Sequence, residues 1–189
     1  VYNPIRVVYR ARLSEEQRHL FRAAFVGRVS DAEKRSALGA SALAILGFGW
    51  DDIVTLGREP PPYGGHYMGE VSDRLLHGIY NSVDYLMCPT RNAFLGLPIL
   101  EAMACGTIPV VCNDLDVRQE FLPSSVFPEY DEVEPTAPSI ARFVARFMQD
   151  NDARSEFSER VYRHYQTHWA ARLSPAGVAQ SILNVYQTL

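Results

Sequence analysis

Short apolar runs of strand length alternate with segments of helical period along most of this 189-residue chain. The runs are rich in Val and Ile and lack a clean two-residue alternation, which is typical of strands buried on both faces of a sheet. We expect strands at residues 23–27, 53–56, 66–71, 84–88 and 108–112, and a brief one at 125–127. Strands that alternate with helices in this way predict an α/β fold with a doubly wound parallel sheet.

Capping boxes mark two of the expected helix starts. Ser14 opens the run S-E-E-Q and Ser30 opens S-D-A-E, so that a hydroxyl and an acid three residues later can cap the first turn. We expect helices at residues 14–21, 30–46, 72–82, 98–105, 117–122, 138–149, 153–166 and 175–189. The last three follow the final strand, so the sheet is expected to carry a C-terminal helical tail.

Composition excludes several classes of partner. A net charge of -4 and a pI near 5.7 argue against nucleic acid and against a polybasic membrane contact, because both need a basic face. The three cysteines (Cys88, Cys105 and Cys112) lie in apolar surroundings and form no C-x-x-C pair, which indicates thiols in a reducing compartment. No apolar run has the length of a membrane span and no signal peptide is visible. We expect a cytoplasmic protein, and the initial valine indicates a processed product or a fragment.

The loop after the first expected strand carries residues suited to an anionic ligand. In an open α/β sheet, ligands bind beyond the carboxyl ends of the strands. Gly27 lets a ligand approach the backbone, Arg28 offers a planar fork that matches phosphate oxygens, and Lys34 follows in the first turns of the expected helix. For a single arginine, a surface ion pair is the simpler interpretation, with Lys34 solvated.

A second such loop precedes the helix expected at 98–105. Gly96 and Leu97 expose amides there, Pro98 suits the first helical position, and the amino end of the helix carries partial positive charge. Glu101 is the one acid in this apolar helix. It either belongs to a site or merely complements the helix dipole, which is worth about 0.3–1 kcal/mol. A third loop, at residues 68–71, offers main-chain groups that could read a planar base.

Other catalytic patterns are weaker. His164 and His168 have the i, i+4 spacing of metal ligands, but no third ligand accompanies them, so we expect two exposed histidines on a polar helix. The chain has no G-x-S-x-G elbow and no G-x-G-x-x-G after the first strand, which disfavours a serine hydrolase and a nicotinamide cofactor.

Three stretches resemble a known family. They are FVGRV at 25–29, GEVSDRLLHGIYNSVDYLMCPT at 69–90 and GLPILEAMACGTIPVVCND at 96–114. They are similar to the C-terminal, nucleotide-sugar-binding domain of retaining glycosyltransferases of the GT-B fold, in the branch that includes glycogen synthase and bacterial mannosyl- and glucosyltransferases. The opening VYNPI resembles the segment that enters this domain. The resemblance implies a Rossmann-like donor-binding domain at residues 1–170 and a C-terminal helix at 171–189 that crosses to an absent N-terminal domain.

The resemblance also implies roles for the loop residues. Arg28 and Lys34 would hold the donor diphosphate and stabilise its departure, with Gly27 beside them. The amides of Gly96, Leu97 and Pro98 would face the same diphosphate.

The remaining implied roles concern the nucleoside. Glu101 would accept hydrogen bonds from the ribose hydroxyls, while Glu70 and Val71 would flank the base. Transfer would proceed with retention and without a metal or other cofactor. The implied partners are a nucleoside-diphosphate sugar and an acceptor-binding N-terminal domain or partner chain, through which the protein could associate peripherally with a membrane.

One departure from the family pattern concerns the donor sugar. The pattern E-G-F-G-L-P-x-x-E reads A-F-L-G-L-P-I-L-E here, so Ala93 replaces the glutamate that contacts the sugar. Thr90 or Asn92 could supply polar contacts instead, the sugar could be a deoxysugar, or activity could be weak or lost. The alternative to a hexosyl- or deoxyhexosyltransferase is therefore an inactive GT-B-like nucleotide-binding or interaction module, and a sugar-nucleotide epimerase is a third reading.

The resemblance gives one expectation for the tail. If the last helix returns to another domain, its apolar side chains should be partly exposed in this chain alone. These side chains are Ile182, Val185, Tyr186 and Leu189.

Overall fold

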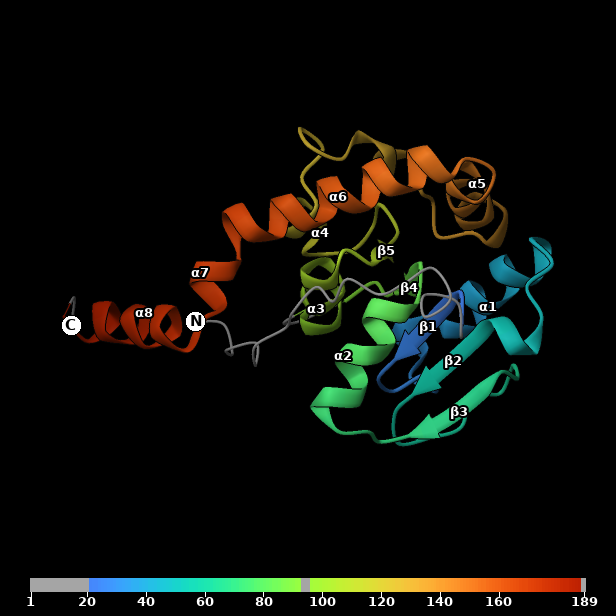
Figure 1. Ribbon diagram of the computed structural model, residues 1–189, viewed down its shortest axis with the longest axis horizontal. Coiled ribbons are helices and arrows are strands. Elements are labelled where there is room, and N and C mark those ends of the chain that lie inside the picture. Colours follow the sequence, from blue (N-terminus) through green and yellow to red (C-terminus); the bar gives the residue numbers. More distant parts are fainter. Residues whose placement is uncertain (1–20, 93–95, 188–189) are drawn as a thin grey trace.

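The computed structural model of the protein describes residues 21–92 and 96–187. Five strands form one sheet: β1 (Ala23–Val26), β2 (Ile53–Leu56), β3 (His66–Gly69), β4 (Tyr85–Met87) and β5 (Ile108–Val110). Their order is β3-β2-β1-β4-β5 and every neighbouring pair is parallel (Figure 1). The chain builds outward from β1 to β3 and then crosses back to β4. This confirms the predicted doubly wound parallel sheet and puts its switch point between β1 and β4.

The helices are α1 (Ser36–Ile45), α2 (Asp73–Ser82), α3 (Leu97–Cys105), α4 (Arg118–Phe121), α5 (Ala137–Met148), α6 (Asn151–His168), α7 (Ala170–Leu173) and α8 (Pro175–Gln187). Most match the predicted helices within a few residues, but α1 begins at Ser36 instead of Ser30 and α7 was not predicted. The helix expected at 14–21 lies outside the described residues. Ser72 caps α2 as predicted, since its hydroxyl accepts a hydrogen bond from the Leu75 amide.

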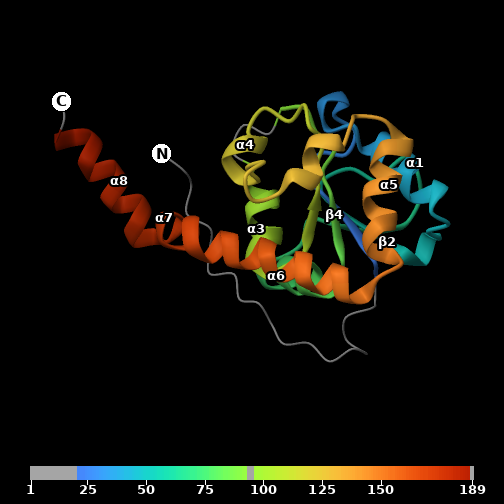
Figure 2. The same ribbon diagram turned by 90° about the horizontal axis from the view of Figure 1, so that it is seen from above.

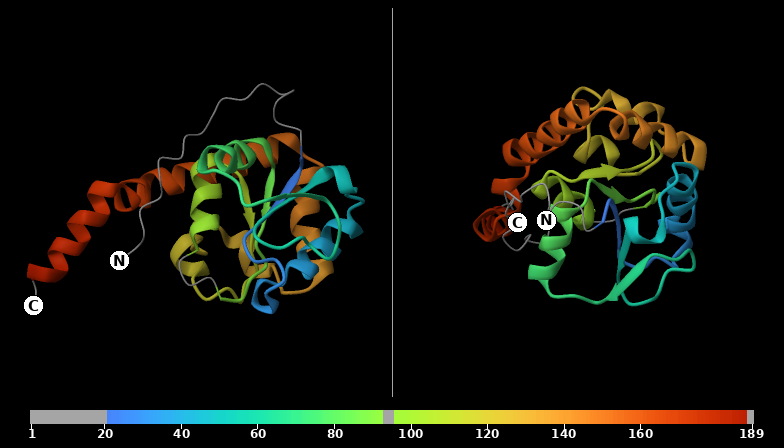
Figure 3. Two further views of the ribbon diagram at one scale, coloured as in Figure 1. Left: turned by 90° about the horizontal axis from the view of Figure 1, so that it is seen from below. Right: turned by 45° about the vertical axis from the view of Figure 1, so that its right-hand side comes forward.

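Both faces of the sheet are covered, which explains the unbroken apolar runs. Phe25 packs in one cluster with Leu43 of α1, whereas Val54 packs in another with Ile79 of α2. Alternate strand residues point to opposite faces, so the inner strands need apolar side chains on both faces, whereas the edge strand β3 is largely exposed. The right-hand view of Figure 3 shows α1 and α2 on opposite sides of the strands.

The helix after β1 begins later than the sequence predicted. Asp31, rather than Ser30, caps a 3-10 turn at Ala32–Lys34, because its carboxylate accepts a hydrogen bond from the Glu33 amide. Arg35 then adopts the left-handed conformation, with φ at 48°, and α1 starts only after it. The prediction that Lys34 lies in the first turns of this helix was therefore wrong. Lys34 lies in the turn that precedes it.

The prediction of a strand at 125–127 was also wrong. The amides of Val126 and Phe127 both donate to the carbonyl of Pro123, at 2.9 and 2.8 Å, so these residues form a turn. Phe127 is nevertheless fully buried, against Tyr130 and Phe157. The apolar pattern reflects this burial and not a sixth strand.

The C-terminal helices divide into two parts. The first part is α5, which packs on α1, and α6, which packs on α3. The second part is α7 and α8, which extend away from the sheet (Figures 1 and 2). Leu183 on α8 is 54% exposed. The four apolar side chains that were expected to be exposed lie outside the described side chains. In the part of the chain that the structure describes, no helix combines the length and the apolar character that crossing a bilayer requires.

Candidate donor site

The loops after β1 and β4 meet at the carboxyl edge of the sheet and are joined by Glu33. Its carbonyl oxygen lies 2.9 Å from the hydroxyl of Thr90 and accepts a hydrogen bond from the Arg91 amide. Its carboxylate accepts a 2.8 Å hydrogen bond from the side-chain amide of Asn92. The structure thus places Thr90 and Asn92 at the switch point, as the sequence predicted, with their polar groups turned toward the β1 loop. Sequence reasoning missed Glu33, because only the fold brings the two loops together.

A second link ties the β1 loop to the loop after β5. Both guanidinium NH2 groups of Arg35 donate to the carboxylate of Asp114, at distances of 3.0 and 2.8 Å. This two-pronged contact raises the pKa of Arg35 above its ordinary value. The same arginine has a left-handed backbone conformation, with φ at 48°. Three loops of the carboxyl edge are therefore connected by side chains, which fixes the walls of the candidate site.

The two predicted phosphate-binding residues differ in their surroundings. Arg28 is 74% exposed at its side chain, and its guanidinium lies 3.8 Å from Asp31. Lys34 is half-buried, and its charge opposes the effect of burial on the thiol of Cys88, whose pKa is raised to about 11. Cys88 directly follows β4, so the charge of Lys34 acts on the β4 side of the switch point, while the Arg28 side chain is exposed to solvent.

Gly27 leaves open space at the end of β1. Its φ is +111°, and a Cβ built there would meet no atom within 4 Å. At Gly57 a Cβ would lie 2.1 Å from the Gly27 carbonyl oxygen, so the loops after β1 and β2 touch through their backbones. Gly27 is therefore packed on one side and open on the other, as a backbone contact to a ligand requires.

The amino end of α3 depends on Gly96. Its φ is +54°, and a Cβ there would lie 2.0 Å from the ring of Phe121. The Gly96 carbonyl accepts hydrogen bonds from the amides of Ile99 and Leu100. Because Pro98 has no N–H, the donors that this helix end can offer an anion are the amides of Gly96 and Leu97. Pro98 contributes its geometry rather than a hydrogen bond.

Glu101 is half-buried on a helix whose neighbouring positions are buried. One of its carboxyl oxygens accepts a 3.0 Å hydrogen bond from the hydroxyl of Tyr80 on α2. Burial raises the pKa of Glu101 to about 7; the Tyr80 hydrogen bond acts against this rise and the charge of Asp73 adds to it. The contact with Tyr80 was missed because this tyrosine lies on the apolar stripe of α2 and was assigned to the core.

Glu70 and Val71 lie at the far side of the sheet edge. Glu70 is exposed and forms a 2.9 Å ion pair with the exposed Arg58, whereas Val71 is half-buried beside the Val54 cluster. Both follow β3, and β2 and β1 separate that strand from β4. Three strand spacings of about 4.8 Å put them roughly 14 Å from the β4 side of the switch point. The structure therefore does not cluster them with Lys34 and Asn92. A ligand that touches both must span the edge.

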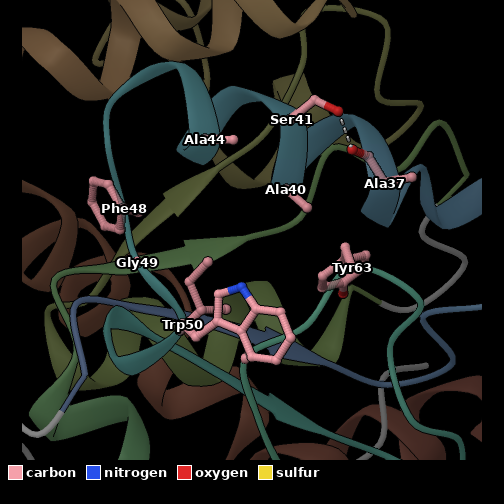
Figure 4. Close-up of a pocket in the computed structure, with 10 residues that line it drawn as sticks. Ala37, Ala40, Ser41, Ala44, Phe48, Gly49, Trp50 and Tyr63 are labelled. Carbon is pink, nitrogen blue, oxygen red and sulfur yellow. Dashed lines mark hydrogen bonds between the residues drawn. The ribbon is translucent and has the colours of Figure 1, made fainter.

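Ala93 and Phe94, where the chain departs from the family pattern, lie outside the described residues. A pocket of about 290 Å3 lies elsewhere, between α1 and the segments around Trp50 and Tyr63 (Figure 4). Its lining includes none of the predicted site residues, so it is not the candidate site.

The expectation of two exposed histidines on α6 was half wrong. His168 is exposed, but His164 is only 7% exposed, with its ring stacked on His168 and against the edge of Phe127. Burial and the nearby His168 lower the pKa of His164. Within residues 21–92 and 96–187, no group of three or more His, Cys, Asp or Glu side chains has the arrangement of a metal site. The three cysteines remain as thiols, as predicted.

Comparison with protein families gives a clear result. The model of the family "Glycosyl transferases group 1" matches residues 5–144, which is most of the chain. The protein therefore belongs to this glycosyltransferase family. No curated protein sequence matches the chain significantly.

Several solved structures share the fold of this chain. The C-terminal domain of the group 1 glycosyl transferase LpcC from Francisella tularensis matches with a TM-score of 0.66 at 17% identity, over 86% of this chain and 96% of that one. Sucrose-phosphate synthase from Thermosynechococcus elongatus matches with a TM-score of 0.72 at 16% identity, over 100% of this chain and 50% of that one.

A third similar structure is Anabaena HepE, solved in complex with UDP and glucose. Its TM-score is 0.70 at 12% identity, over 94% of this chain and 53% of that one. At such low identity these likenesses define the fold, a Rossmann-like half of GT-B type. The chain spans about half the length of the synthase and of HepE.

Proposed function

We propose that this chain is the donor-binding half of a retaining glycosyltransferase, which transfers a hexose or deoxyhexose from a nucleoside-diphosphate sugar. The family match supports the reaction class. The observation that carries the donor assignment is the carboxyl edge itself. The residues that support the assignment are Arg28 and Lys34 in the loop after β1, the amino end of α3 in the loop after β4, and Glu101 on α3.

The diphosphate would bind at this switch point. Lys34, whose charge acts on Cys88 beside β4, would turn toward the diphosphate. The exposed Arg28 would swing from its 3.8 Å contact with Asp31 toward this anion of higher charge. The amides of Gly96 and Leu97 add the partial positive charge of the helix end. These groups would stabilise the charge that develops on the departing diphosphate, which needs no metal ion.

The nucleoside would extend from the diphosphate along the sheet edge. Glu101 would accept hydrogen bonds from the two ribose hydroxyls, since an ionised carboxylate offers about four acceptor sites and Tyr80 uses one. Glu70 and Val71, on the far side of the edge, would flank the base. Thr90 and Asn92 would approach the sugar, although their described polar groups bond to Glu33 and would have to exchange these partners.

The acceptor would come from elsewhere. The solved glycosyltransferases that are about twice as long carry sequence that this chain does not match. We propose that an N-terminal domain or partner chain binds the acceptor, with α8 crossing to it, and that any peripheral membrane contact belongs to that half. The chain alone should then bind donor with little turnover.

Titration calorimetry tests the donor assignment. The nucleotide to try first is UDP, followed by GDP, dTDP and their sugar conjugates. We expect one of these nucleotides to bind, with an affinity that falls as salt rises. The absence of binding for all of them at millimolar concentration would overturn the proposal.

A second candidate is a GT-B-like binding module without catalysis. Ala93, in place of the sugar-contacting glutamate of the family pattern, favours it. An assay of the longer protein, or of this chain with its partner, separates the two. Turnover of any donor sugar excludes the module, and nucleotide binding without turnover supports it.

A further inference from the structure

The hydrogen bond between Tyr80 and Glu101 joins α2 to α3 below the candidate donor site. Tyr80 is fully buried, and its hydroxyl donates to a carboxyl oxygen of Glu101 at 3.0 Å. Its backbone is fixed as well, because the side-chain hydroxyl of Thr107 donates to the Tyr80 carbonyl. The phenol is therefore held in a fixed position beside the Glu101 carboxyl.

We propose that Tyr80 is a positioning residue for donor binding, which orients the Glu101 carboxyl and keeps it ionised so that it can accept both ribose hydroxyls. This inference rests on the proposed function, because it gives Glu101 a nucleotide to bind. It adds a residue on a different helix, which touches Glu101 and not the donor.

The geometry supports orientation. A glutamate side chain has three rotatable bonds, and fixing them on binding costs free energy. A hydrogen bond from a buried phenol selects one placement of the carboxyl before the ligand arrives, which reduces that cost. Tyr80 occupies one acceptor site of one oxygen, so acceptor sites on both oxygens remain for a vicinal diol.

The groups around Glu101 show why its carboxyl needs a hydrogen bond to stay ionised. The helix α3 packs against α2, α6 and β5. Several titratable groups on these elements and their neighbours interact electrostatically with Glu101 or with Tyr80. They are Asp73, Tyr80 itself, Cys88, Cys105 and Tyr165. All of them are neutral or acidic near pH 7, so burial and Asp73 both disfavour the carboxylate, and Tyr80 is the group that favours it.

The test compares Tyr80→Phe with the unaltered chain. The substitution removes one oxygen and keeps the buried ring, so the fold should persist, which a thermal melt verifies. Nucleotide affinity is measured by calorimetry from about pH 6 to 9. The carboxyl carbon of Glu101 is followed by NMR over the same range without nucleotide. For the unaltered chain we expect affinity to weaken as the pH falls through the Glu101 titration.

For Tyr80→Phe, that midpoint should move to higher pH in both measurements, and affinity near neutral pH should fall about three- to tenfold. Tyr130→Phe is the matched control. Tyr130 is equally buried, but its hydroxyl donates to the Pro109 carbonyl and not to Glu101. This control should change neither midpoint. Glu101→Gln should bind weakly, with no pH dependence over this range.

The outcomes separate the two proposals. If the unaltered chain binds nucleotide and Tyr80→Phe has the same affinity and midpoint, the role of Tyr80 is overturned and the donor assignment stands. If the unaltered chain binds no nucleotide, both are overturned, even where NMR shows the Glu101 midpoint moving. A fall in affinity with Tyr80→Phe that persists unchanged at high pH supports orientation alone and overturns the part about ionisation.

Discussion

At the scale of single residues, Glu101 combines a folding cost with a proposed binding role. Its pKa rises from 4.5 to about 7 in the folded chain. The folded state therefore binds more protons than the unfolded state between these values. Stability should fall as the pH rises through that window and level off above it. A carboxyl whose charged form is stabilised by the fold would show the opposite trend.

Glu101→Gln should remove this cost. We expect the variant to be more stable than the unaltered chain by about 2–3 kcal/mol near pH 8, and about equally stable near pH 5. Urea unfolding at the two pH values measures the difference. The same variant should lose nucleotide affinity, so a gain in stability would accompany a loss of binding. Equal stability of both proteins at both pH values would show that Glu101 is solvated.

A second residue-scale prediction concerns Gly96. Gly96→Ala should destabilise the fold by about 2–4 kcal/mol, because it forces a left-handed alanine and a contact with Phe121. The matched control is Gly78→Ala, at an exposed helical position of α2 where a Cβ would meet nothing within 4 Å. The control should be stabilised by about 0.5–1 kcal/mol. Thermal melts of the pair should therefore shift in opposite directions. A shift of the same sign in both would contradict the packing described around α3.

At the scale of elements, the Arg35–Asp114 contact should determine how firmly the β1 loop is held. Asp114→Asn keeps the shape of the side chain but removes the negative charge that pairs with the Arg35 guanidinium. We expect a loss of about 1–2 kcal/mol in stability. Hydrogen exchange should speed up in residues 28–35, because the ion pair no longer holds the strained backbone at Arg35. Exchange in β2 and α2 should remain unchanged. Uniform acceleration across the chain would point to global destabilisation instead.

Element-scale patterns were also the most predictable part of the molecule. Five strands and the helices from α1 onward, apart from the short α7, followed from apolar runs, caps and prolines, since those signals are local. The break at Arg35 was not predictable, because an arginine rarely adopts a left-handed conformation and its restraint, Asp114, is 79 residues away. The turn at Phe127 was misread because burial in an aromatic cluster and burial in a sheet give the same apolar pattern.

The candidate site was predictable in its parts and not in its assembly. Gly27, Gly96 and Glu101 stood out because glycines and a lone acid in apolar stretches need an explanation. Glu33 and Tyr80 did not stand out, because one lay in a capping pattern and the other on a helix stripe. Their roles depend on contacts between loops or helices that only the folded sheet brings together.

At the scale of the whole molecule, the tail should be separable from the sheet domain. In the described structure α8 packs mainly on α7 and projects from the body (Figure 2). Deleting residues 174–189 should lower stability by no more than about 2 kcal/mol, chiefly through the loss of Val178 burial. Nucleotide affinity should be unchanged. A chain that fails to fold without these residues would show that α8 is part of the core.

The central claim is that a nucleoside diphosphate binds across the carboxyl edge at the β1–β4 switch point. Hydrogen exchange with and without saturating nucleotide tests it most directly, using whichever of UDP, GDP or dTDP binds best. We predict slower exchange in residues 27–35, 88–92 and 96–101, and no change around Trp50 and α8. Protection confined to the pocket beside Trp50, or to no part of the carboxyl edge, would contradict the claim.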